Sequence, residues 1–223
     1  MGMKILQIIL VFMLSNLLQA QDWPQLSYYQ ETNKALKTAG NKVEAVFFGD
    51  SITEGWPQFN PSFFDSNNFV GRGIGGQTTP QLLLRFRQDV LSLRPKKVIL
   101  LAGINDIAEN TGPIALEAIM ENIKGMTEIA IANNITMILC SVLPANSFPW
   151  RPSIIPTDKV IALNQMIKAY ALQQNLIYVD YYTSMVNDML GLKSSLGYDT
   201  VHPNKAGYAL MENVLLKSLQ IDE

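Results

Sequence analysis

An apolar run that stops abruptly at Gly49-Asp50-Ser51 is the strongest local signal in this sequence. The run includes Val43 and Phe47 and is typical of a buried strand. Glycine permits the tight turn at which a strand is followed by a helix. The pattern therefore predicts that Ser51 lies at the carboxyl end of a strand, where open α/β sheets bind ligands. Asp50 and Ser51 could also serve only as helix caps, and this stretch alone does not separate the two interpretations.

The first twenty residues have the composition of a secretory signal peptide. Lys4 is their only charged residue, and the stretch from Ile5 to Leu14 is almost wholly apolar. A small residue, Ala20, stands at the expected cleavage point. The apolar stretch is short for a membrane span, and a buried or interfacial helix is the alternative. We therefore predict a signal peptide over residues 1–20 and a single domain over residues 21–223.

The overall composition limits the classes of protein to which the chain can belong. Its 223 residues are 48% hydrophobic, which suits one globular domain with a large core. The net charge of −2 offers no electrostatic case for a nucleic-acid partner. Cys140 is the only cysteine, so we expect a small core residue and no intramolecular disulfide. Because no cysteine directly follows the signal peptide to take a lipid, we predict a secreted or periplasmic protein without a stable membrane anchor.

Apolar segments alternate with amphipathic segments along the rest of the chain. We predict strands at residues 43–49, 68–71, 97–102, 135–142 and 176–180. We predict helices at about residues 22–40, 80–93, 158–173 and 205–219, and one that starts at Pro113. Residues 52–57 are expected to form a short helix or loop that Pro57 ends. Strands that are apolar on both faces and separated by helices indicate an α/β fold, in which a parallel sheet is covered on both sides.

Four polar segments stand at the ends of predicted strands or in the last loop. They are Asp50-Ser51, the glycine loop that leads to Gln77, Asn105-Asp106 and residues 199–202. The carboxyl ends of parallel strands meet at one edge of a sheet. We therefore expect the first three segments to share that edge, with the last loop folded over it.

His202 is the only histidine and a candidate general base. Asp199 stands three residues earlier, so its carboxylate can reach Nδ1 and orient the ring with Nε2 toward Ser51. A serine hydroxyl needs such a base to act as a nucleophile at neutral pH. A lone histidine is more often structural or simply exposed, so this pair alone leaves both interpretations open.

Acyl transfer also requires hydrogen-bond donors for the oxyanion that forms in the transition state. Gly76 could offer its backbone N–H, because a residue without Cβ allows close approach. Asn105 could offer its side-chain amide, and Ser51 its own N–H at the start of a helix. For Asn105-Asp106, a turn or a helix cap is the default alternative.

The glycine loop over residues 71–76 has a competing interpretation. It fits the G-x-G-x-x-G pattern of dinucleotide-binding proteins. That fingerprint requires an acidic residue near the end of the next strand, but this strand ends in Ala102-Gly103, and Asp89 falls within the intervening helix. A metal site is also weakly supported, because one histidine and one cysteine would leave only carboxylates as ligands. We predict neither a cofactor nor a metal.

Together, these segments resemble the SGNH/GDSL hydrolase family of serine esterases and lipases over about residues 41–219. The matching blocks are Gly49-Asp50-Ser51-Ile52, Gly73-Ile74-Gly75-Gly76, Gly103-Ile104-Asn105-Asp106 and Asp199-Thr200-Val201-His202-Pro203-Asn204. Ile52 stands where the family often has leucine, which is a conservative change. The resemblance implies a flavodoxin-like, three-layer α/β/α sandwich with five parallel strands and no metal or organic cofactor.

The resemblance also implies roles for individual residues. Ser51 would be the nucleophile, His202 the base and Asp199 its orienting carboxylate. The oxyanion hole would consist of Ser51, Gly76 and Asn105. Residues 73–79 resemble members related to the platelet-activating-factor acetylhydrolase catalytic subunit, a pattern that bacterial lysophospholipase-like and carbohydrate acetylesterase members share.

We therefore predict a serine esterase that removes short acyl groups, most simply O-acetyl groups, from a small-molecule or glycan ester. The alternatives are a lysophospholipase or thioesterase, and a non-catalytic carbohydrate- or lipid-binding relative, since fold does not determine function. The residues expected to flank the site are Ile52, Trp56, Phe59, Tyr198 and residues 144–156. Trp56 and Trp150 could stack on a sugar, but we favour a role as loop anchors. The sequence does not predict the oligomeric state.

Overall fold

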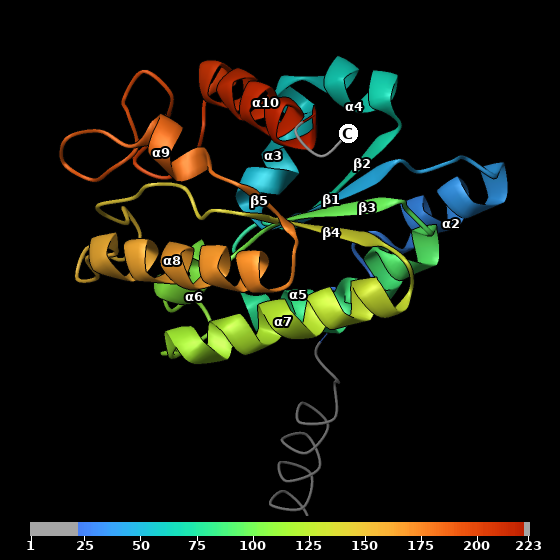
Figure 1. Ribbon diagram of the computed structural model, residues 1–223, viewed down its shortest axis with the longest axis horizontal. Helices are drawn as coiled ribbons and strands as arrows, with labels where there is room; N and C mark the ends of the chain where they lie inside the picture. Colours follow the sequence, from blue (N-terminus) through green and yellow to red (C-terminus); the bar gives the residue numbers. More distant parts are fainter. Residues whose placement is uncertain (1–21, 221–223) are drawn as a thin grey trace, which may run out of the picture.

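A five-stranded parallel sheet forms the centre of the computed structural model, which describes residues 22–220 (Figure 1). The strands are β1 (Ala45–Gly49), β2 (Phe69–Gly73), β3 (Lys97–Leu101), β4 (Thr136–Cys140) and β5 (Ile177–Val179). Their order in the sheet is β2-β1-β3-β4-β5. In register, Gly49 at the end of β1 lies between Gly73 and Leu101. The predicted parallel sheet is thus confirmed, whereas the predicted signal peptide at residues 1–20 lies outside the described residues.

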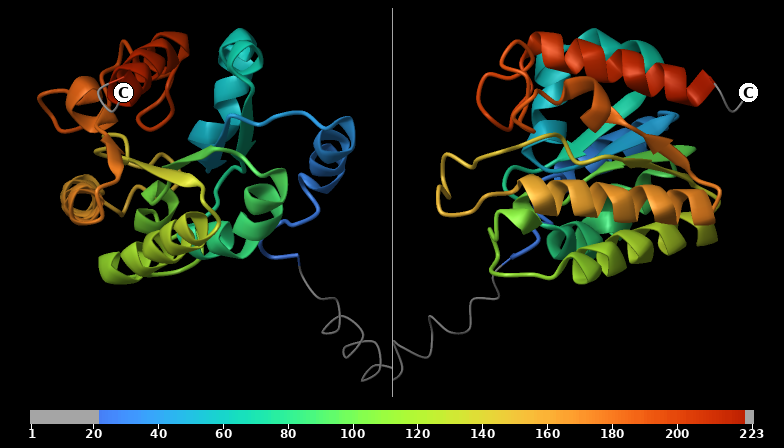
Figure 2. Two further views of the ribbon diagram at one scale, coloured as in Figure 1. Left: turned by 45° about the vertical axis from the view of Figure 1, so that its right-hand side comes forward. Right: turned by 60° about the vertical axis from the view of Figure 1, so that its left-hand side comes forward.

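Helices cover both faces of the sheet (Figure 1; Figure 2). One face carries α3 (Ser51–Phe59), α4 (Pro61–Asn67), α9 (Tyr181–Met185) and α10 (Lys205–Gln220). The other carries α5 (Thr79–Asp89), α7 (Leu116–Ala132) and α8 (Thr157–Gln173), with α2 (Gln30–Ala39), α6 (Ile104–Ile107) and the short 3-10 helix η1 (Leu91–Leu93) beside them. This arrangement confirms the predicted three-layer α/β/α sandwich.

The interior strand β1 is buried along its whole length, and its side chains alternate between the two layers. Phe47 faces α3 and α4, where its ring lies 5.2 Å from that of Trp56 and 4.9 Å from that of Phe64. Phe48 faces the opposite layer and meets Phe86 of α5 edge to face at 5.4 Å. Each such buried phenylalanine contributes about 1.5–3 kcal/mol by leaving water. This burial holds the carboxyl end of β1 firmly between the two helical layers.

The helix after β1 differs from its prediction, because Pro57 does not end it. Proline removes one N–H from a helix interior, but α3 continues to Phe59, and the N–H of Asn60 still donates to the carbonyl of Trp56. The ring of Pro57 packs against Gly71, where an added Cβ would lie 2.7 Å from Pro57 Cγ. This packing against β2 offsets the lost hydrogen bond.

Other element boundaries also differ from the predictions. The first helix begins at Gln30, because the carboxylate of Asp22 accepts the N–H groups of Leu26 and Ser27 and holds the preceding residues in turns. Strand β2 runs to Gly73 rather than ending at residue 71. Helices α4, α6 and α9 were not predicted. Asn60 caps α4, which starts with a proline, so this helix did have a sequence signal.

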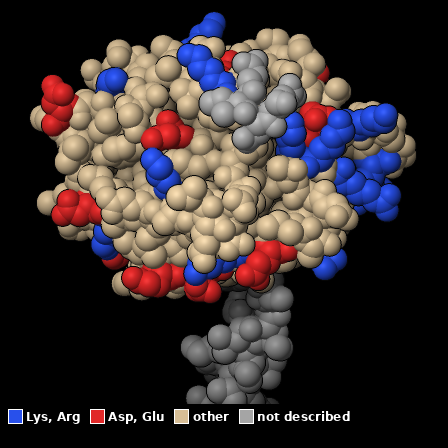
Figure 3. Space-filling view, in the orientation of Figure 1, with Lys and Arg blue, Asp and Glu red and all other residues tan. Residues whose placement is uncertain are grey.

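Charged side chains are sparse over much of the face shown in Figure 3, and basic ones gather at the end that carries α2. None of the helices within residues 22–220 is long and apolar enough to cross a membrane. Cys140 is buried in β4, as predicted. The assignment to a single domain and the absence of a nucleic-acid partner stay predictions.

Candidate active site

The turn between β1 and α3 places Ser51 at the carboxyl edge of the sheet. Asp50 caps α3, since its Oδ1 accepts the N–H of Ile52 at 3.0 Å, and Ser51 is the first helical residue. Two glycines allow this turn to sit against neighbouring strands. A Cβ added to Gly49 would lie 2.3 Å from the carbonyl oxygen of Leu101. A Cβ added to Gly73 would lie 2.1 Å from a backbone nitrogen of α3. Asp50 therefore caps α3, and the same turn places Ser51 at the edge of the sheet.

The structure brings the predicted nucleophile, base and carboxylate together. Ser51 Oγ lies 3.0 Å from Nε2 of His202 across 151 residues of sequence. Nδ1 of His202 lies 2.8 Å from Oδ2 of Asp199. The other carboxylate oxygen, Oδ1, accepts the backbone N–H groups of Val201 and His202, each at 2.7 Å. A continuous chain of hydrogen bonds therefore runs from Asp199 through the imidazole to the serine hydroxyl.

The environment of Asp199 favours its ionised form. Partial burial raises the pKa of this carboxyl, but the hydrogen bonds from His202 and from the N–H of Val201 outweigh burial, and the net pKa lies below its usual value. Asp199 is therefore charged at neutral pH, where it can hold the imidazole orientation and stabilise an imidazolium. The ring of Tyr198 stacks on His202 at 5.4 Å, and that of Trp150 lies 6.2 Å from it.

The three predicted oxyanion donors remain available for a ligand. Neither the N–H of Ser51 nor that of Gly76 finds a hydrogen-bond acceptor within the described part of the chain. Gly76 adopts φ +74°, a conformation that favours glycine. Nδ2 of Asn105 donates one hydrogen to the carbonyl of Gln77 at 3.1 Å, and its second hydrogen is uncommitted.

The contacts of Asp106, the neighbour of Asn105, argue against the dinucleotide interpretation of the glycine loop. Its two carboxylate oxygens accept the N–H of Thr79 at 3.0 Å each, and Oδ1 also accepts the Thr79 hydroxyl at 2.6 Å. Thr79 is the first residue of α5. A dinucleotide fold would place its pyrophosphate at this helix terminus, but a carboxylate of the protein occupies it. Asp106 is thus a helix cap, while Asn105 beside it faces the glycine loop.

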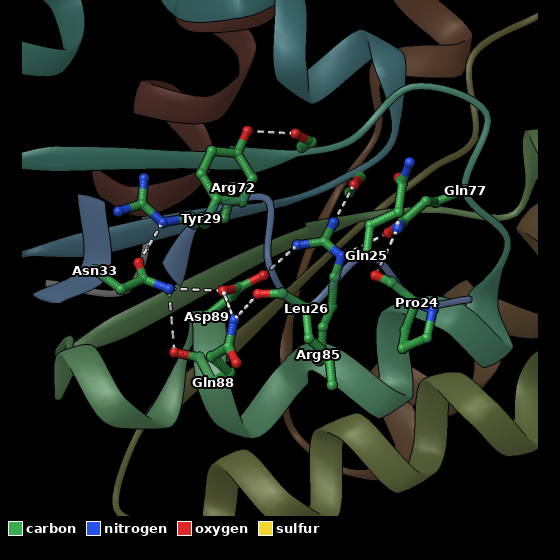
Figure 4. Close-up of polar contacts among 12 residues, drawn as sticks. Pro24, Gln25, Leu26, Tyr29, Asn33, Arg72, Gln77, Arg85, Gln88 and Asp89 are labelled. Atoms are coloured by element: carbon green, nitrogen blue, oxygen red, sulfur yellow. Dashed lines mark hydrogen bonds and ion pairs between the residues drawn. The ribbon is translucent and has the colours of Figure 1, made fainter. Parts of the chain in front are cut away.

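Sequence analysis missed a buried ionic cluster beneath the site (Figure 4). The side chain of Arg85 is fully buried, and its Nη1 lies 3.0 Å from the carboxylate of Asp89. Nη2 donates to the carbonyl of Gly49 at 2.8 Å, and Nε donates to Oε1 of Gln77 at 2.5 Å. Arg85 therefore connects Gly49, the residue before Asp50, to the glycine loop through hydrogen bonds. The spacing of Arg85 and Asp89 on one helix was the available signal.

A second missed residue, Glu54, supports the glycine loop from α3. Its Oε2 accepts the N–H of Gly75 at 2.8 Å, and its Oε1 accepts the hydroxyl of Tyr28 at 2.5 Å. An added Cβ on Gly75 would lie 3.9 Å from Cβ of Ser51. Glu54 therefore holds the loop segment that runs directly beside the serine.

The residues expected to flank the site divide into two groups. Ile52 and Trp56 are about 1% exposed and belong to the core, so their predicted place beside the site is wrong. Trp56 is an anchor, as favoured, and its Nε1 donates to Glu212 at 3.0 Å. Trp150 and Tyr198 are 41% and 63% exposed and lie beside the imidazole. They form the aromatic surface that a substrate would meet.

The buried carboxyl of Asp50 predicts a pH-dependent stability. Burial raises its pKa to about 7, and its Oδ2 has no hydrogen-bond partner among residues 22–220. Burial likewise raises the pKa of Asp106 to about 6. Because the native state binds these protons more tightly than the unfolded state, the stabilisation is complete below about pH 4 and is lost as pH rises through 6–7.

We therefore expect the free energy of unfolding to fall by on the order of 2 kcal/mol between pH 5 and pH 8. Urea denaturation at four pH values in this range measures it. Asp50→Asn, which is neutral throughout, should reduce the slope. A stability that rises with pH in the wild-type protein would contradict this assignment.

Within the described residues, no group of three or more His, Cys, Asp or Glu side chains is arranged to hold a metal ion. The predicted absence of a metal and of a cofactor stays a prediction.

Comparison with known proteins agrees with this geometry. The model of the GDSL-like lipase/acylhydrolase family matches residues 47–210. The structure is similar to that of a GDSL-like lipase from Bacteroides thetaiotaomicron VPI-5482, with a TM-score of 0.85 and 41% identity over 91% of this chain and 100% of that chain.

Two curated proteins are more distant relatives. The acetylxylan esterase of Geobacillus stearothermophilus is 24% identical over 162 residues, which are 67% of this chain and 71% of that protein. The uncharacterized lipoprotein YqeF of Bacillus subtilis (strain 168) is 30% identical over 118 residues. That match spans 45% of this chain and about half of that relative's length, 49%. The chain belongs to the GDSL-like lipase/acylhydrolase family and is a carboxylic ester hydrolase.

Proposed function

We propose that the protein is a secreted or periplasmic serine esterase that uses Ser51, His202 and Asp199 as a catalytic triad. The observation that carries the proposal is the hydrogen-bonded chain Ser51 Oγ–Nε2 at 3.0 Å and Nδ1–Asp199 Oδ2 at 2.8 Å. Release from the cell would follow cleavage after Ala20, which the composition of residues 1–20 supports.

The reaction proceeds by two acyl transfers. Ser51 Oγ attacks the ester carbonyl carbon while Nε2 of His202 takes the hydroxyl proton. The bond from the carbonyl carbon to the alcohol oxygen then breaks, and His202 returns the proton to that oxygen. Water attacks the acyl-serine with His202 as base, which releases the carboxylic acid and restores Ser51. Asp199 keeps the ring oriented and stabilises its charged form.

The oxyanion of each tetrahedral intermediate would be held by three donors. They are the N–H groups of Ser51 and Gly76 and the free hydrogen on Nδ2 of Asn105. Their lack of other acceptors supports this role. Such donors stabilise the transition state more than the ground state, because the negative charge on the carbonyl oxygen develops only during attack.

The proposed substrate is an O-acetylated carbohydrate. Trp150 and Tyr198 present exposed rings that pack against the imidazole of His202. Aromatic rings of this kind pack on the apolar faces of sugars while their polar atoms stay hydrated. Similarity to an enzyme named acetylxylan esterase supports the same class.

Initial rates on p-nitrophenyl acetate, octanoate and palmitate test the acyl preference. We expect kcat/KM to be highest for acetate and to fall at least tenfold by octanoate. Release of acetate from an acetylated oligosaccharide, measured with and without Ser51→Ala, tests the alcohol part of the substrate.

The other outcomes separate the alternatives. Rates that rise with chain length would favour a lysophospholipase or thioesterase and overturn the acetyl preference. A folded protein that a fluorophosphonate does not label at Ser51, and that hydrolyses none of these esters, would favour a binding protein.

A further inference from the structure

Asn110, in the loop after α6, contacts two of the predicted oxyanion donors, Gly76 in the glycine loop and Asn105 in α6. Its Nδ2 lies 2.9 Å from Oδ1 of Asn105 and 3.2 Å from the carbonyl oxygen of Gly76. Its Oδ1 accepts the indole N–H of Trp150 at 3.2 Å. One side-chain amide therefore joins the glycine loop, the Asn105 turn and the loop over residues 144–156.

The chemistry of these partners determines which way each amide points. An indole nitrogen can only donate, so the oxygen of Asn110 must face Trp150. The amino group of Asn110 must then face the two acceptors, Gly76 O and Asn105 Oδ1. Because the oxygen of Asn105 is held by Asn110, its own amino group is directed to the opposite side, where it donates to Gln77 and keeps one hydrogen free.

Every polar atom of the Asn110 amide is used in this chain. Both of its hydrogens and its oxygen have a partner at hydrogen-bond distance. Rotation of either amide by 180° would bring two oxygens or two amino groups together. Because the indole N–H of Trp150 can only donate, it determines which way the amide of Asn110 points, and Asn110 in turn determines which way the amide of Asn105 points.

We propose that Asn110 is a positioning residue that orients the oxyanion donors Asn105 and Gly76, and that its own orientation is set by the indole N–H of Trp150. The proposal rests on the proposed function of Ser51 as nucleophile. It adds that the loop over residues 144–156 controls the oxyanion hole as well as the surface that a substrate meets. Phe148 of this loop is fully buried, and its ring packs against that of Trp150 at a tilt of 32° and a distance of 5.2 Å, which holds the indole in place.

Asn110→Asp tests the direction of these hydrogen bonds, because aspartate has almost the same shape as asparagine. The carboxylate offers only acceptors, which would oppose both Gly76 O and Asn105 Oδ1 and turn the Asn105 amide away from the oxyanion. Full loss of one oxyanion donor costs about 10²–10³ in kcat. We expect kcat on p-nitrophenyl acetate to fall about 10–100-fold with KM changed less than about threefold, since the donor acts in the transition state.

Trp150→Phe removes the indole N–H and keeps an aromatic ring. We expect a smaller fall in kcat, about 3–10-fold, because Asn110 retains its two donor contacts. If both residues act through one series of hydrogen bonds, Asn110→Asp combined with Trp150→Phe should be no more than about 1.5-fold slower than Asn110→Asp alone. Independent effects would instead multiply.

Asn133→Asp is the matched control. Asn133 is exposed at the end of α7, three residues before β4 begins, and its Nδ2 donates to the carbonyl of Ile129 at 2.8 Å. This variant therefore adds the same charge at the opposite edge of the sheet from Ser51. It should keep kcat within about twofold of wild type. Circular dichroism and thermal unfolding of each variant confirm that the fold is retained.

The results distinguish failure of the proposal from failure of the proposed function. If Ser51→Ala abolishes turnover but folded Asn110→Asp keeps kcat within twofold, Asn110 does not position the donors. If the losses in kcat of Asn110→Asp and Trp150→Phe multiply in the double variant, Trp150 does not act through Asn110. If Ser51→Ala keeps its turnover, the nucleophile itself is wrong.

Discussion

Ser51→Ala should lower kcat on p-nitrophenyl acetate by about 10⁴–10⁶-fold. The expected loss is large because the members of a triad act as a unit, and the base has nothing to activate once the hydroxyl is removed. KM should change little, since the alanine variant keeps the aromatic surface of Trp150 and Tyr198. His202→Ala should give a loss of similar size. The double variant should be within about tenfold of either single variant, because each single change already disables the triad.

Ser62→Ala is the matched control for this experiment. Ser62 is an exposed serine whose hydroxyl donates to Asn60 in the cap of α4. Its removal should leave kcat unchanged within about twofold. Labelling of the wild-type protein by a fluorophosphonate, followed by mass spectrometry of the labelled peptide, identifies the nucleophile independently. Labelling at a serine other than Ser51 would contradict the assignment even if Ser51→Ala were inactive.

Arg85→Met should lower the free energy of unfolding by about 3–5 kcal/mol. The side chains of Arg85 and Asp89 are 0% and 1% exposed, so removing the guanidinium leaves a buried carboxylate without its counterion. It also removes the donors to the carbonyl of Gly49 and to Oε1 of Gln77. Equilibrium denaturation by urea, followed by tryptophan fluorescence, measures the loss.

Two further variants test the cause of this destabilisation. Lys124→Met breaks an ion pair with Glu121 that is exposed on α7, and it should cost less than about 1 kcal/mol. Arg85→Met combined with Asp89→Leu removes both buried charges and should recover part of the loss. If Arg85→Met alone stays within about 1 kcal/mol of wild type, the buried pair does not stabilise the fold as we propose.

Figure 4 shows that this cluster continues from Asp89 to Asn33 and Arg72. Asn33 of α2 donates to Asp89 at 2.7 Å and accepts Nε of Arg72 at 2.8 Å. Nε2 of Gln77 donates to the carbonyl of Pro24 at 2.9 Å. The segment that precedes β1 therefore contacts the glycine loop through buried polar groups, and its loss should affect that loop before it affects the rest of the sheet.

Most of the sheet could be predicted from the sequence. Strand β1 is a short apolar run that ends at Gly49, and β3 is an apolar run that ends at Leu101, two residues before Gly103. The hydrophobic pattern is a local property of each segment. The errors occurred where a contact with another segment overrode the local preference. Pro57 normally ends a helix, but its packing against Gly71 of β2 lets α3 continue.

The candidate site was predictable to a similar extent. Asp199 and His202 lie within one turn, so their spacing alone indicated that the carboxylate could orient the ring. The approach of Ser51 to His202 followed from the expectation that the last loop folds over the edge at which the carboxyl ends of the parallel strands meet. The spacing of Arg85 and Asp89 indicates that pair, but the contacts of Arg85 with Gly49 and of Asn110 with Gly76 were not found, because a single polar residue has no pattern that marks a partner in another segment.

Short-range spacing and hydrophobic period were thus sufficient for the strands, the α/β class and the Asp199–His202 pair, since these depend on residues that are near one another in the chain. The contacts of Arg85 with Gly49 and of Asn110 with Gly76 join residues 36 and 34 positions apart. Their existence depends on how closely α5 and the loop after α6 pack against the end of β1, and on which atoms that packing leaves at hydrogen-bond distance. The folded arrangement therefore determined how the proposed oxyanion donors are oriented, because a hydrogen bond requires a distance and a direction that spacing along the chain does not specify.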